Sequence, residues 1–177
     1  KGQMKHLCDE LLDKTPRSEF DLISNFSQKF PVIVISKMLG IPEEMAPQLI
    51  NWSGSMVAMY QARKDKCIEE RAVSATKEFS KYLNTLLKHK AINPSDDLFS
   101  HILNANQREE PLSTKEIIST VILLLNAGHE ATVHTISNGI KTIIESKIVL
   151  QDLLPNTKRL IDEILRHATP LHMFTRY

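Results

Sequence analysis

The segment from Ala127 to His134 reads AGHEATVH and holds the residues whose types could do chemistry. It is close to the H-E-x-x-H pattern, in which two histidines four residues apart share one helix face and bind zinc. Here the histidines, His129 and His134, are five residues apart, so they diverge by roughly 140° around a helix. We therefore predict no metal site in this chain. Each histidine is interpreted as a partly buried polar residue satisfied by a neighbour.

The same segment places two small residues, Ala127 and Gly128, beside a carboxylate at Glu130. Glycine inside a helix costs about 1 kcal/mol relative to alanine, so something flat or bulky is expected to pack there. An unpaired carboxylate deep in an apolar helix is also costly. One interpretation is a ligand groove with a proton path. The other is that Gly128 lets a second helix approach while Glu130 points to solvent, and the segment alone leaves both open.

A second pattern is formed by Glu163 and Arg166, an E-x-x-R pair whose members are three residues apart. At this spacing a glutamate and an arginine meet on one face of a helix. Such pairs are common on helices, so this one indicates little by itself.

Long helices must position these residues. Ser113 and Glu116 form a capping box, and the helical pattern then continues to about Ile144 without a proline. That is roughly 30 residues, or about 45 Å, long enough to cross a domain. A last helix is predicted from Asn156 to about His167, where Thr169-Pro170 follows. Earlier helices are predicted over residues 4–13, before Gly40, from Ile41 past Met56, over 64–89 and over 97–106.

Strand signals are few. A short extended piece is predicted within residues 20–28, and a strand could begin in residues 171–177. The predicted fold class is therefore all-α, or mostly α with a few short strands, around a long central helix.

Composition excludes several function classes. The chain of 177 residues carries 22 basic and 21 acidic side chains, and its net charge of +1 provides no excess of positive charge for binding nucleic acid. No apolar run reaches the length of about 18 residues that indicates a membrane span. The two cysteines, Cys8 and Cys67, form no C-x-x-C pair, which favours a reducing, cytoplasmic setting.

The two patterns together are more specific than either alone. A-G-x-E-x-T in the long helix is followed by E-x-x-R at Glu163, then by Pro170 and Arg176. This arrangement resembles the cytochrome P450 family of haem-thiolate monooxygenases, of the soluble bacterial type. Residues 20–44, with F-D-L, a proline-led apolar helix and L-G-I-P-E-E, are similar to the same family. The resemblance covers nearly the whole chain and implies a partial cytochrome P450 fold.

The resemblance implies roles for individual residues. Ala127 and Gly128 would face the haem and the oxygen, and Glu130 would help to relay protons to bound dioxygen. Substrate contacts would come from three further residues, Leu123, Asn126 and Met56.

Three residues outside that group also take roles from the resemblance. Glu163 and Arg166 would be a structural pair that braces the haem-binding core. Arg176 would bind a haem propionate, because its planar, positively charged guanidinium can donate two hydrogen bonds to a carboxylate.

Three departures from the family pattern matter. In one of them the connection between the long helix and E-x-x-R is a few residues short, with Ser146-Lys147 near the place of the family's usual H-P turn. Ala131 stands where the family has threonine, and Thr132 comes one place later, turned by about 100°. Oxygen activation by Glu130, Ala131 and Thr132 would then need a substrate hydroxyl, an ordered water or a different chemistry. The third departure is the missing cysteine loop, F-x-x-G-x-H-x-C-x-G, whose context neither cysteine has. Residues 1–177 are therefore expected to be a single internal helical segment of a larger haem-thiolate monooxygenase-like domain.

The implied activity is monooxygenation. In the full-length parent, haem b iron would activate dioxygen with electrons from a ferredoxin- or reductase-type redox partner and oxidise a small apolar substrate. The chain alone lacks the axial cysteine and is expected to be inactive and to self-associate through exposed apolar surface. Two alternatives stay open, a truncated non-catalytic helical remnant without haem and a haem enzyme that uses peroxide.

Overall fold

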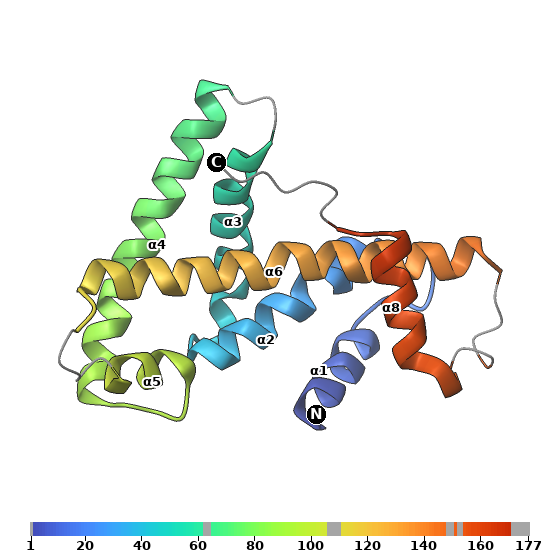
Figure 1. Cartoon of the computed structure of the whole chain (residues 1–177), viewed down its shortest axis with the longest axis horizontal. Coiled ribbons are helices and arrows are strands. Elements are labelled where there is room, and N and C mark those ends of the chain that lie inside the picture. Colours follow the sequence, from blue (N-terminus) through green and yellow to red (C-terminus); the bar gives the residue numbers. More distant parts are fainter. Residues whose placement is uncertain (1, 62–64, 106–110, 148–150, 152–153, 171–177) are drawn as a thin grey trace. The chain divides into compact units, whose positions relative to one another are not determined.

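The computed structural model describes residues 2–61, 65–105, 111–147, 151 and 154–170. These residues form helices and no strand, which confirms the predicted all-α class (Figure 1). They divide into two compact units, one of residues 29–130 and one of residues 1–28 with 131–177, and each is described by itself. The strand expected in residues 171–177 lies outside the described residues.

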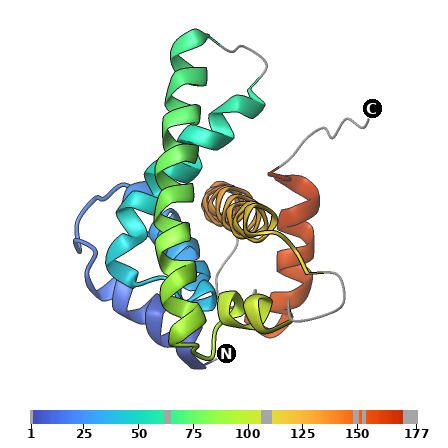
Figure 2. The same ribbon diagram turned by 90° about the vertical axis from the view of Figure 1, so that its left-hand side faces the viewer.

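The unit of residues 29–130 is built from five helices and two short 3-10 turns. They are α2 (Lys29–Leu39), η2 (Glu43–Met45), α3 (Ala46–Val57), η3 (Ala58–Tyr60), α4 (Lys66–Ile92), α5 (Leu98–Ala105) and the first part of α6 (Thr114–Glu145). Helix α3 packs beside α4, and both lie on one side of α6 when that helix is viewed nearly along its axis (Figure 2). This packing is what brings α3 to the middle of α6.

The core of this unit is a set of apolar side chains on α2 to α6. Trp52 stacks on Phe79 with ring centroids 5.0 Å apart, and its indole nitrogen donates a hydrogen bond to Glu78 Oε2 at 3.1 Å. An indole buried in this way keeps its polar atom paired while its rings fill the core. The other fully buried apolar residues include Val32, Leu39, Leu49, Leu83, Phe99, Val121 and Leu125.

Gly40 ends α2 as the sequence predicted. Its φ of +67° is a left-handed conformation that glycine adopts without strain, and the Ile41 N–H donates to the Ser36 carbonyl at 2.9 Å. A side chain at this position would also collide with the buried ion pair between Lys90 and Asp97. Glycine is therefore required here both by the backbone and by its surroundings.

The other unit contains α1 (Gly2–Asp13), a π-helical turn η1 (Ile23–Ser27), the rest of α6, η4 (Leu154–Asn156) and α8 (Thr157–His167). The short extended piece predicted within residues 20–28 is wrong, because η1 occupies that position. Asp21 explains the difference, since its Oδ1 accepts from the Ile23 N–H at 3.0 Å and its carbonyl accepts from the Asn25 N–H at 3.0 Å. These bonds start a helical turn there.

Helix α6 begins where its capping box predicted. The Ser113 N–H donates to Glu116 Oε2 at 2.8 Å, and the Glu116 N–H donates to Ser113 Oγ at 3.3 Å. The helix then runs for 32 residues to Glu145. Gly139 allows α8 to approach it closely, because an added Cβ would lie 3.0 Å from Ile164 Cγ2.

Candidate active site

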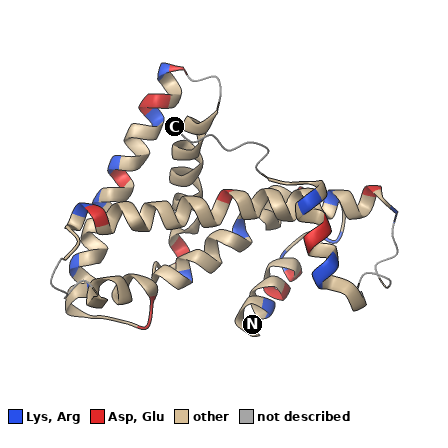
Figure 3. Ribbon diagram, in the orientation of Figure 1, with Lys and Arg blue, Asp and Glu red and all other residues tan. Residues whose placement is uncertain are grey.

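The middle of α6 has a buried side and an open side. Between Glu116 and Lys141 the helix holds one charged residue, Glu130, and this stretch is almost uncoloured in Figure 3. On one side Leu125 is fully buried. On the other side Leu123 is 63% exposed and Ala127, one turn later, is also exposed. An apolar stripe left open in the middle of a long helix is a surface that can receive an apolar ligand.

Gly128 does not lie on this open stripe. A Cβ added to it would come 2.5 Å from Ile35 Cδ1 of α2, so the glycine is required by the packing of α2 on α6. Of the two interpretations left open by the sequence, this contact matches the approach of a second helix. Ala127, turned by about 100° from Gly128, is the small residue that faces outward.

Helix α3 contacts α6 beside the open stripe. Met56 Sδ lies 3.9 Å from Asn126 Nδ2, and Ser53 Oγ lies 3.3 Å from His129 Nδ1. A Cβ added to Gly54 would lie 3.9 Å from Glu130 Oε1. The half-buried carboxylate of Glu130 therefore sits next to α3, at the edge of the stripe.

The two histidines of AGHEATVH point in different directions, as their spacing predicted. His129 is 1% exposed and pairs with Ser53, whereas His134 is exposed. Among the described residues no three histidine, cysteine or acidic side chains lie close enough together to hold a metal ion.

The helix continues past Glu130, and position 131, where the family has threonine, carries no hydroxyl. Ala131 is exposed, and its carbonyl accepts a hydrogen bond from Thr135 Oγ1 at 2.8 Å. Thr132 is half-buried, so it does not share the exposure of Ala131.

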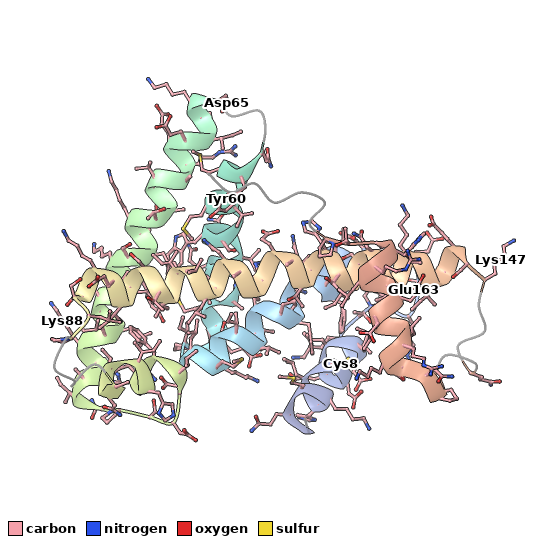
Figure 4. The ribbon with its side chains drawn as sticks, in the orientation of Figure 1. Cys8, Tyr60, Asp65, Lys88, Lys147 and Glu163 are labelled. Atoms are coloured by element: carbon pink, nitrogen blue, oxygen red, sulfur yellow. The ribbon has the colours of Figure 1, made fainter. Side chains whose placement is uncertain are left out.

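The predicted E-x-x-R pair forms on α8. Arg166 Nε donates to Glu163 Oε2 at 2.8 Å and its Nη2 donates to Oε1 at 2.6 Å, a two-pronged contact (Glu163 is labelled in Figure 4). The hydrogen bonds and charge of Arg166, with the charge of His167, lower the pKa of Glu163. Both side chains are exposed in the described chain. Arg176, the predicted propionate ligand, lies outside the described residues.

The two cysteines differ in environment. Cys8 lies within α1 (Figure 4), where burial and then the charge of Asp9 raise the pKa of its thiol. Cys67 is exposed in the first turn of α4.

Sequence reasoning missed the α3 residues that contact α6, above all Ser53 and Gly54. The one usable signal was their position on the predicted helix that carries Met56, because that helix was already expected to contribute to the pocket.

No family model matches the chain, but individual proteins do. A cytochrome P450 of Priestia megaterium is 35% identical over 182 residues, a match that spans 99% of this chain and 43% of the relative. The steroid C26-monooxygenase of Mycolicibacterium smegmatis is 27% identical, with 96% of this chain and 43% of the relative covered. A Bacillus megaterium cytochrome P450 solved in complex with testosterone is 29% identical, with a TM-score of 0.86 over 98% of this chain and 47% of that structure. Over nearly its whole length the chain is therefore similar to bacterial cytochrome P450s, as a fragment of one would be.

The matches confirm the resemblance to this family and the partial helical P450 fold that A-G-x-E-x-T and E-x-x-R indicated. The chain spans less than half the length of the cytochrome P450s that it matches. In the part of the chain that the structure describes, no helix has both the length and the hydrophobicity needed to cross a bilayer.

Proposed function

We propose that this chain supplies the oxygen- and substrate-facing helices of a haem-dependent monooxygenase. The substrate is small and apolar, and electrons come from a ferredoxin- or reductase-type partner. The haem, when bound, supplies the activation of dioxygen. The observation that carries the proposal is the open apolar stripe of Leu123 and Ala127 on α6, with the carboxylate of Glu130 at its edge.

The residues on the stripe fit a flat, apolar group. Ala127 and Ala131, four residues apart, add only a methyl group each to an exposed helix face, so a planar ring could approach the helix closely. In this proposal Gly128 supports that face indirectly, by letting α2 pack against an adjacent flank of α6.

Glu130 would hold and move protons at its carboxylate, beside the place where the ligand lies. Its position next to Gly54 of α3 keeps it half-buried, a setting in which a carboxylate can exchange protons with a ligand or water. The substrate would be contacted by Met56, Leu123 and Asn126. The side chains of Met56 and Asn126 contact each other. Leu123 is exposed one turn before Ala127. The pair of Glu163 and Arg166 would position neighbouring structure and take no part in the chemistry.

The axial thiolate would come from neither Cys8 nor Cys67. A thiol whose pKa is raised, as that of Cys8 is, forms less of the thiolate that binds iron. Cys67 is exposed in the first turn of α4. The isolated chain would then be inactive and would self-associate through its exposed apolar side chains.

A tryptophan at Ala127 tests the proposal. The change Ala127→Trp would fill the open stripe and should reduce haem incorporation severalfold in a full-length protein that carries this chain. Lys115→Trp, an exposed change in the first turn of the same helix, is the matched control and should leave haem incorporation unchanged. Equal haem content in the wild type and the Ala127→Trp variant would contradict the proposal.

A second candidate function is favoured by Ala131. With no hydroxyl at this position, the usual proton delivery is weakened, and a haem enzyme that takes its oxygen from peroxide becomes the alternative. Product analysis with labelled dioxygen separates the two. Label in the product supports monooxygenation, and turnover with peroxide alone that leaves the product unlabelled supports the second candidate.

A further inference from the structure

A cavity lies between α3 and α4, near the ends of these helices that Tyr60 and Asp65 mark in Figure 4. Its volume is about 320 Å³, at the lower end of the range of about 300–1,000 Å³ that is typical of small-molecule pockets. Apolar walls come from Ile50, Ala58 and Ile68. The cavity therefore has the size and the apolar surface to hold a small organic molecule.

The cavity lies on the side of α3 that faces away from the core. Ile50 and Gly54 line it, four residues apart on one face of the helix. Trp52 and Met56 are buried in the core, and each is turned by about 200° from one of these two residues. The cavity is therefore separate from the contact that Met56 makes with Asn126 of α6.

Three polar side chains also line the cavity, those of Asn51, Ser55 and Arg71. Asn51 and Arg71 are exposed and Ser55 is half-buried, so a ligand can reach all three. None of these side chains forms a hydrogen bond or an ion pair with another residue that the structure describes. The acid next to Arg71 in the sequence, Glu70, has its Oε1 3.8 Å from Lys66 Nζ instead. The guanidinium therefore keeps its donors for a ligand.

The charges around the cavity favour an anion on its α4 side. Among the described residues that line it, none is acidic and Arg71 is the one cation. Glu130 lies behind the α3 wall, because a Cβ added to Gly54 would be 3.9 Å from its Oε1. A negatively charged group would be repelled from that wall and attracted to the guanidinium. A carboxylate fits best, since a guanidinium can donate two parallel hydrogen bonds to it.

We propose that this cavity binds a small apolar carboxylate, whose charged end pairs with Arg71 and whose apolar body lies against Ile50 and Ile68. Asn51 and Ser55 donate further hydrogen bonds to the carboxylate oxygens. The inference goes beyond the proposed function, because this site requires neither haem nor the open stripe on α6.

A pair of probes that differ in charge tests the site in a full-length, haem-loaded protein that carries this chain. Calorimetry compares cyclohexanecarboxylate with cyclohexanecarboxamide, which is neutral and has nearly the same shape. We expect the wild type to bind the carboxylate about fivefold more tightly, the effect of an ion pair at a partly exposed site. Arg71→Met keeps an apolar stem and removes the guanidinium, so it should bind both probes equally. Lys77→Met, which removes a positive charge from α4 outside the cavity, is the matched control and should retain the preference.

A change that fills the cavity separates this site from the open stripe. Ala58→Phe places a ring in the cavity and should weaken the binding of both probes, whereas Leu123→Val, on the stripe, should leave both unchanged. Three results would each overturn the inference. They are failure of the carboxylate to bind the wild type, a preference for the carboxylate that survives in Arg71→Met, and binding that Leu123→Val weakens and Ala58→Phe does not.

Discussion

At the scale of single residues, two small neighbours on α6 have different roles. Gly128 lies where Ile35 of α2 meets the helix, whereas Ala127 lies on the open stripe. Alanine at position 128 would favour the helix by about 1 kcal/mol. It would also force Ile35 Cδ1 to move, because that atom would lie 2.5 Å from the new Cβ.

We therefore predict that the effect of Gly128→Ala depends on residue 35. In an Ile35→Val background, which lacks the Cδ1 atom, Gly128→Ala should raise the free energy of unfolding by about 1 kcal/mol. In the wild-type background most of that gain should disappear, giving a coupling of about 0.5–1 kcal/mol. Urea denaturation of the four proteins measures the cycle. The same gain in both backgrounds would show that Ile35 does not press on Gly128.

The ion pair of Lys90 and Asp97 is a second residue-scale feature. Both side chains are almost fully buried, and the carboxylate also accepts from the Ser95 hydroxyl and, at 2.8 Å, from the Ser100 N–H. Burial alone would raise the pKa of Asp97, but these hydrogen bonds and the charge of Lys90 hold it below its ordinary value. A carboxyl with a lowered folded pKa stabilises the protein above its unfolded value of 3.8 and loses that contribution as pH falls through the lower folded value.

Removal of either partner should be strongly destabilising. Lys90→Met leaves a buried carboxylate without its cation and should cost about 3–5 kcal/mol. In the wild type, unfolding measured from about pH 7 down to about pH 3 should show a loss of stability in acid that is smaller in Asp97→Asn. The control is Asp96→Asn, an exposed neighbour of the same type, which should change stability little. A loss of stability in acid that is as large in Asp97→Asn as in the wild type would contradict this account.

The candidate site could be predicted from the sequence only where its signal is local. The E-x-x-R contact between Glu163 and Arg166 depends on helical spacing alone, so it was predictable and it forms. The role of Gly128 was left open, because spacing within one helix does not say which second helix will meet it. Ser53 was missed for the same reason, since its partner His129 is distant in the sequence.

At the scale of elements, most helices could be predicted from apolar periodicity and caps. The predicted span of 64–89 corresponds to α4 at Lys66–Ile92, and the capping box sets the start of α6. The extended piece expected within residues 20–28 does not form, because Asp21 accepts short-range hydrogen bonds from the Ile23 and Asn25 N–H groups that start η1 there. Apolar periodicity gives no sign of such bonds. Helix length was predictable because it depends on the absence of proline and on terminal caps.

The capping box of α6 carries an element-scale prediction. Ser113→Ala removes the hydroxyl that accepts from the Glu116 N–H, so the first turn of α6 should exchange its amide hydrogens faster while the middle of the helix is unchanged. Hydrogen bonds from Ser113 also lower the pKa of Glu116 below 4.5, so the cap should weaken as pH falls through that lower value. Thr114→Ala, inside the first turn, is the control. Unchanged exchange in Ser113→Ala would exclude a role for the cap.

At the scale of the whole molecule, the similarity to cytochrome P450s and the length of the match lead to a claim about haem. The match to cytochrome P450s covers 99% of this chain but 43% of the Priestia megaterium relative. In the proposed function, the open apolar stripe of α6 receives a planar group. Its two cysteines, one with a raised thiol pKa and one on an exposed turn, are poor candidates for an axial ligand.

We therefore predict that the isolated chain, mixed with haem, reduced and treated with carbon monoxide, will not show the absorption band typical of thiolate-ligated haem. Any haem that it binds would lie on the open stripe without a thiolate, so Ala127→Trp should abolish that binding, whereas Cys8→Ser and Cys67→Ser should leave it unchanged. A thiolate-type band that disappears in either cysteine variant would refute the prediction. It would then place the axial ligand within residues 1–177 and make the isolated chain a complete haem site.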